Sequence, residues 1–191
     1  MDKRILTLII IAIAGTLFSG TLEPWKNLDD FENGRKNWSM WADSSSKPPE
    51  FSLVAVAQGG GHAASILFPA TSGQAIAGKH GIFIPRNENA LRFRICSSTG
   101  AMPELLLEEA PGAEGAGDVF RYRVPAAAPG QWEEVTVPLS DFAYAYAKGG
   151  KGNRMLDRNA MFSLNISFSR QPGAVTLLLD DLAWTNRKEA K

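Results

Sequence analysis

Hydrophobic and polar residues alternate in short runs along most of this chain. Alternation is clearest over residues 162–168, where Phe, Leu, Ile and Phe are separated by Ser, Asn and Ser. Successive side chains of a β-strand point to opposite faces, so this period of two indicates strands with one buried face. Clusters of Gly, Pro, Asn and Ser between the runs supply turns. The pattern predicts strands within residues 51–57, 65–68, 91–95, 119–124, 133–137, 162–168 and 175–179.

No segment of the sequence shows sustained helical periodicity, and only residues 140–148 suit a short helix as well as a strand. Seven or more short strands joined by turns are typical of an antiparallel β-sandwich. We therefore expect an all-β fold, an antiparallel β-sandwich, with a single domain over residues 21–191. A chain of 191 residues can bury enough surface to fold without a metal or a disulfide.

The alternation also divides several strands into a core side and a polar side, as a sandwich requires. The expected core residues are Leu91, Phe93, Ile95, Phe120, Tyr122, Val124, Phe162, Leu164, Ile166 and Phe168. The polar residues that we select as ligand candidates are Arg92, Arg94, Arg121, Arg123 and Asn165. If these strands share a sheet, their polar sides form one surface suited to a sugar or a carboxylate. The alternative is that the four arginines are solvated strand residues, paired with acids such as Glu108.

The N-terminus has the composition of an export signal. Lys3 and Arg4 precede an apolar run from Ile5 to Phe18, which is short for a membrane-spanning helix of about 20 residues. We predict that residues 1–20 are a signal peptide, with an uncleaved N-terminal anchor as the alternative. The protein would then be secreted, periplasmic or at the cell surface, and a membrane would be a partner only if this segment were retained.

Composition and motifs exclude several classes of function. Twenty Lys and Arg balance twenty Asp and Glu, which argues against non-specific nucleic-acid binding because that requires a basic excess. A single cysteine, Cys96, excludes an intrachain disulfide and a CxxC site. The two histidines stand in no HExxH pattern, and the sequence has no GxSxG motif. We therefore expect no enzyme, although a glycosidase that combines distant acids stays open.

Four stretches together resemble a known family. They are LDDFENG at residues 28–34, ALRFRI at 90–95, GQWEEVTVPLSDF at 130–142 and TLLLDDLAW at 176–184. In this order and spacing they resemble the galactose-binding-like jelly-roll carbohydrate-binding modules of the family 11 type. The resemblance covers nearly the whole chain after the leader, and the pattern is more specific for the fold than for a ligand.

The resemblance implies a secreted, non-catalytic module that binds a glycan or polysaccharide. Aromatic rings stack on the apolar faces of sugars, so Trp41, Tyr144 and Tyr146 become candidate contacts. The arginines among the candidates favour an acidic sugar, if a sugar is bound. Relatives of this fold also act in the assembly of large complexes. A protein-interaction domain with a protein partner and no sugar ligand is therefore the alternative.

The resemblance also implies one structural Ca²⁺. Its ligands would be Glu32 and Asp180, with Asp30 and Asp181 as neighbours. Ca²⁺ binds about six to eight oxygen atoms, mostly from carboxylates and backbone carbonyls. Two acidic pairs brought together from distant parts of the sequence would repel each other unless a cation or a basic group lay between them. The alternative is that these acids cap a turn and end a strand.

Overall fold

The computed structural model describes residues 27–56, 61–111, 117–149 and 152–186. The predicted leader, residues 1–20, lies outside these ranges. Regular structure within them is almost entirely β, and the one exception is a short 3₁₀ helix at Leu139–Asp141. The same ranges contain no helix that is long and apolar enough to cross a membrane.

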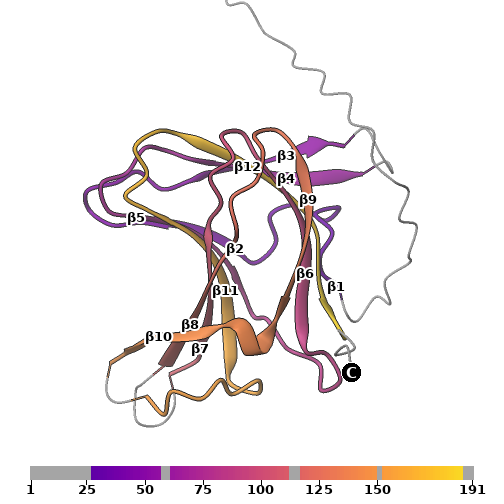
Figure 1. The fold of residues 1–191 in the computed structure, drawn as a ribbon, viewed down its shortest axis with the longest axis vertical. Helices are drawn as coiled ribbons and strands as arrows, with labels where there is room; N and C mark the ends of the chain where they lie inside the picture. The colour runs from indigo at the N-terminus through magenta and orange to yellow at the C-terminus, as the bar shows by residue number, and fades with distance from the viewer. Residues whose placement is uncertain (1–26, 57–60, 112–116, 150–151, 187–191) are drawn as a thin grey trace, which may run out of the picture.

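Within the described residues, twelve strands form two antiparallel sheets that lie face to face (Figure 1). The first, which we call the β6 sheet, has the order β3 (Glu50–Ala55), β4 (His62–Phe68), β12 (Val175–Thr185), β6 (Ala90–Ser97) and β9 (Trp132–Pro138), and β1 (Asn27–Asp29) also pairs with β12. The second, the β11 sheet, has the order β10 (Ala143–Lys148), β8 (Gly117–Arg123), β7 (Glu104–Glu109), β11 (Met161–Ser169), β5 (Gln74–His80) and β2 (Trp38–Ala42).

The hydrophobic core lies between the two sheets. Phe93 and Ile95 of β6 and Phe120 and Ile166 of the β11 sheet are almost completely buried. Burying each such side chain contributes about 1.5 to 3 kcal/mol to folding. The expected antiparallel β-sandwich is therefore confirmed, with the predicted polar sides of the strands turned outward.

All seven predicted strands are present, with ends that differ by a few residues from those expected. Four others were missed: β1, β2, β5 and β7. The β7 sequence hides its alternation because Leu105, Leu106 and Leu107 follow one another, and Leu106 is buried on the outer side of its sheet. The ambiguous segment 140–148 contains the end of the 3₁₀ helix and then strand β10.

Register shifts in several strands change which way side chains point. In β11 the register with β7 shifts between Met161 and Ser163, so Phe162 is an extra residue on its strand. Phe162 is therefore 44% exposed, and its expected place in the core is wrong. Further shifts lie between Tyr144 and Tyr146 in β10 and in β12 after Asp180. A strict period of two fails wherever a strand carries such an extra residue.

Candidate functional site

The outer side of the β11 sheet, which we call the polar face, carries a connected group of hydrogen-bonding side chains. Leu164, Ile166 and Phe168 of β11 point into the core, so Ser163, Asn165 and Ser167 between them point outward. Strand pairing places His80, Gly78 and Ile76 of β5 beside these three residues on one side. On the other side they are flanked by Glu108, Leu106 and Glu104 of β7.

Asn165 lies near the middle of the polar face and is held by its neighbours. Its Nδ2 donates to Glu108 Oε2 at 3.1 Å and to Ser163 Oγ at 3.2 Å. The Asn165 side chain also covers Gly78, where an added Cβ would lie 2.4 Å from Asn165 Oδ1. With only 7% of its surface exposed, Asn165 is fixed before any ligand arrives.

Charged groups on the polar face are arranged in ion pairs. Arg123 Nη2 donates to Glu104 Oε1 at 2.7 Å, and Arg121 Nη1 lies 3.9 Å from the other oxygen of Glu104. Lys148 Nζ donates to Glu108 Oε1 at 2.6 Å. The face therefore presents donors and acceptors in nearly balanced charge rather than a field of one sign.

Exposed aromatic side chains stand at both edges of the polar face. Trp41 on β2 is 51% exposed, and Tyr146 on β10 is 44% exposed. Trp41 shares the outer side with Ile76, and Tyr146 shares it with Val119. The six strands of this sheet are separated by five spacings of about 4.8 Å each, so the strands that carry Trp41 and Tyr146 are about 24 Å apart. The polar face is thus a long platform with an aromatic ring at each end.

Several solved structures that match this fold are carbohydrate-binding modules. The family 11 module from Clostridium thermocellum, in complex with a β-1,3-1,4-mixed-linked tetrasaccharide, matches with a TM-score of 0.69 and 17% identity over 86% of this chain and 97% of that chain. The family 11 module of the cellulosomal cellulase Lic26A-Cel5E of the same organism matches with a TM-score of 0.68 and 19% identity, over 86% and 96%. A family 30 carbohydrate-binding module gives 0.57 and 17%, over 80% of each chain.

This chain has the family 11 fold. The expected jelly-roll fold is therefore confirmed. No protein-family model matches the sequence, and no curated protein matches it either.

The family 11 fold brings together five of the eight predicted ligand residues. These are Trp41, Arg121, Arg123, Tyr146 and Asn165, all on the polar face. Tyr144 is not on the polar face, because the β10 bulge pairs it with the core residue Phe120. Its ring packs edge-on against the Phe120 ring, with the centroids 6.1 Å apart, and the Arg154 guanidinium lies 5.5 Å from the centroid of the Tyr144 ring.

Arg92 and Arg94 belong to β6 and therefore to the opposite sheet of the family 11 fold. The four arginines do not form one surface. Arg94 stacks on the Trp132 ring at 5.0 Å, and its Nη1 lies 3.7 Å from Asp180 and 3.8 Å from Asp181. Trp132 lies on the outer side of the β6 sheet, where it pairs with Cys96.

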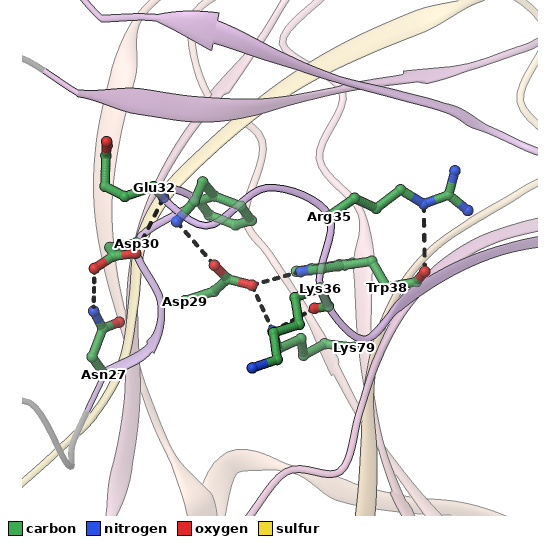
Figure 2. Close-up of polar contacts among 9 residues, drawn as sticks. Asn27, Asp29, Asp30, Glu32, Arg35, Lys36, Trp38 and Lys79 are labelled. Atoms are coloured by element: carbon green, nitrogen blue, oxygen red, sulfur yellow. Dashed lines mark hydrogen bonds and ion pairs between the residues drawn. The ribbon is translucent and has the colours of Figure 1, made fainter.

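Two of the predicted metal ligands lie in the loop after β1. Asp30 accepts hydrogen bonds from Asn27 Nδ2 at 3.0 Å and from the Glu32 amide at 3.2 Å (Figure 2). Glu32 accepts from the His62 amide at 2.5 Å, and its second oxygen lies 3.1 Å from His62 Nδ1. The backbone hydrogen bond from His62 is the main reason that the pKa of Glu32 is lowered.

Among the acids of this region, Asp180 has the pKa that is shifted most from its ordinary value. Burial raises its pKa to about 6, and the neighbouring carboxylate of Asp181 and the more distant one of Glu32 add to the rise. Among the residues that the structure describes, no three His, Cys, Asp or Glu side chains are grouped so that they could hold a metal ion. Both Glu32 oxygens face His62, and Arg94 already supplies a positive charge beside Asp180. The calcium site stays a prediction.

Several residues of the polar face were not selected from the sequence. They are Ser39, His80, Glu104, Ser163 and Ser167. Ser163 and Ser167 could have been selected, because each stands two positions from Asn165 on the same strand. Ser39 and His80 lie on β2 and β5, which were not recognised as strands, so no pattern assigned them a face.

Proposed function

We propose that this protein is a non-catalytic glycan-binding domain whose ligand lies across the polar face. The observation that carries the proposal is the pair of exposed rings, Trp41 and Tyr146, at the two ends of a fixed row of polar side chains. Sugars present apolar ring faces and hydroxyl edges, so stacking and hydrogen bonding together suit them. The family 11 modules with the same fold support this reading by analogy.

The length of the polar face favours an oligosaccharide over a single sugar. Two rings about 24 Å apart can engage one ligand only if the ligand spans several sugar units. Asn165 between them offers its oxygen, and the carboxylates beside it accept hydrogen bonds from hydroxyl groups. The ligand would therefore lie roughly across the strands.

The ion pairs of the polar face favour a neutral glycan. Arg121 and Arg123 share the carboxylate of Glu104, so their charge is compensated before a ligand binds. An acidic sugar would compete with Glu104 for these guanidinium groups. We therefore propose a neutral glycan in place of the acidic sugar that the arginine content favours, and we expect binding to change little with salt concentration.

The acids of the polar face are poorly placed for glycoside hydrolysis. Glu104 and Glu108 are four residues apart on one strand, so their backbones are about 13 Å apart. Glycosidases hold their two carboxyl groups about 5 to 9.5 Å apart, on either side of the bond that breaks. Each of these glutamates also forms an ion pair, Glu104 with Arg123 and Glu108 with Lys148. We therefore propose binding without catalysis, and export directed by residues 1–20.

Binding measurements on the protein and matched variants test this proposal. Titration calorimetry against neutral and acidic polysaccharides should give saturable binding to a neutral class. Trp41→Ala and Tyr146→Ala should each weaken it about tenfold, about 1.4 kcal/mol, since each removes one stacking ring. Leu67→Ala, which removes an exposed apolar side chain from β4 of the other sheet, should bind normally. Absence of binding to every glycan, with a protein partner that co-purifies, would instead support the assembly domain.

A further inference from the structure

Phe162 is an exposed aromatic residue that the bulge in β11 turns outward. Met161 before it and Leu164 after it are buried in the core, whereas 44% of Phe162 is accessible. Its ring lies 5.5 Å from the ring of His80. Because His80 pairs with Ser163 in the sheet, both rings lie at the polar face.

The backbone around Phe162 is held in place on the β5 side. The Phe162 carbonyl accepts hydrogen bonds from the Gly81 amide at 2.9 Å and the Ile82 amide at 3.4 Å. On the next strand but one, Ser39 Oγ lies 2.6 Å from His80 Nε2, which fixes the plane of the imidazole against which Phe162 rests. The exposed ring is therefore oriented in advance, as binding platforms require.

Phe162 does not lie on the line that joins Trp41 and Tyr146. Trp41 shares its row with Ile76 and Ser167, whereas Tyr146 shares its row with Val119, Glu108 and Ser163. A glycan that runs from Trp41 to Tyr146 would cross β11 near Asn165. Phe162 lies beyond Ser163 on that strand, about 10 Å to the side. Ser163, His80 and Ser39 occupy the space between.

We propose that Phe162, with His80 and Ser39, forms a side subsite for a sugar branch, so that the ligand is a substituted glycan. The proposal rests on the proposed function, because it assumes that the unbranched backbone of the glycan lies across the polar face. A branch leaving the glycan backbone above Asn165 would meet the exposed hydroxyl group of Ser39 and then stack on the Phe162 ring, whereas Ser163 beneath it is fully buried.

Matched pairs of oligosaccharides test the side subsite. We would titrate the full protein with xylose-substituted and unsubstituted β-glucan, and with galactose-substituted and unsubstituted mannan. The wild type should bind the substituted member of one pair about fivefold more tightly. Phe162→Ala should remove that preference and leave affinity for the unsubstituted member unchanged, whereas Phe162→Trp should keep the preference because a ring remains.

The outcomes separate this proposal from the one on which it rests. Equal affinity of the wild type for both members of every pair that it binds overturns the side subsite alone. So does an equal loss of affinity for both members in Phe162→Ala, with Leu67→Ala as the control on the other sheet. If the wild type binds no glycan, both proposals fail. NMR provides a second, independent readout. The signals of the His80 ring should shift when the substituted oligosaccharide is added and should not shift with the unsubstituted one.

Discussion

Asp29 connects three parts of the chain near the start of the sandwich (Figure 2). One oxygen accepts hydrogen bonds from Trp38 Nε1 at 2.8 Å and from Lys79 Nζ at 2.6 Å, and the other accepts from the Phe31 amide at 2.9 Å. Lys79 also donates to the Lys36 carbonyl at 2.9 Å and is almost fully buried. The pair therefore anchors the loop after β1 to β2 and β5, the strands that carry Trp41 and His80.

Removing one member of this buried pair should destabilise the protein strongly. Asp29→Ala leaves the Lys79 ammonium without its counter-charge, and we expect a loss of about 3 kcal/mol in the free energy of unfolding, measured by urea denaturation. Asp29→Ala combined with Lys79→Met should recover part of the loss, because no buried charge is then unpaired. Glu133→Ala, on an exposed part of β9, is the control and should change stability little. An unchanged urea midpoint for Asp29→Ala would contradict the assignment.

Asp180 should make stability depend on pH. Its pKa in the folded protein is about 6, above the ordinary value, so its ionisation favours the unfolded chain and stability falls as pH rises from about 4 to above 6. In EDTA, Asp180→Asn should therefore be more stable than the wild type by about 2 kcal/mol at about pH 8 and equally stable near pH 4. Thermal unfolding at both pH values measures the difference.

Added calcium distinguishes a metal site from the arginine contact in the same experiment. If Ca²⁺ binds beside Asp180, it should raise the melting temperature of the wild type and leave Asp180→Asn unchanged, because one carboxylate ligand is lost. If Arg94 alone balances the acids, neither protein should respond to calcium or to EDTA. A wild type insensitive to both reagents would remove the predicted site.

At the scale of the strand, sequence patterns predict that a strand is present better than they predict which face each of its side chains points to. Alternation in β6 and β8 gave the correct core residues, because neither strand contains an extra residue within the run used. In β11 the same rule placed Phe162 in the core, since a bulge leaves no signature in the order of hydrophobic and polar residues. β5 escaped recognition because small residues and Gly78 replace the branched side chains that mark most strands.

Gly78 should be needed for the polar face and not only for the strand. In Gly78→Ala the new Cβ would lie 2.4 Å from Asn165 Oδ1, so Asn165 must move away from its hydrogen bonds with Glu108 and Ser163. We expect glycan affinity to fall about tenfold, with a stability change of about 1 kcal/mol. Gly173→Ala, where no atom lies within 4 Å of the new Cβ, should bind normally. Normal binding by Gly78→Ala would show that Asn165 takes no part.

At the scale of the whole molecule, the sequence predicted two layers but not which strand joins which layer. Neighbours in a sheet are far apart in the chain: β12 lies between β4 and β6, and β11 lies between β7 and β5. Arg92 and Arg121 occupy similar alternating runs and yet face away from opposite sides of the sandwich. Only pairing between distant strands decides this, so the polar face could be predicted as a type of surface but not as a set of residues.

The described chain starts and finishes in neighbouring strands, because Asn27 of β1 is paired with Ala183 near the end of β12. Both strands belong to the β6 sheet, and the polar face is on the far side of the other layer. A bead, a dye or a second domain attached at Asn27 or at Asn186, where the described residues begin and end, would therefore leave the proposed ligand platform uncovered. The same closeness means that a short linker could join Asn27 to Asn186 in a shortened chain, and new termini could be opened in a surface turn by circular permutation.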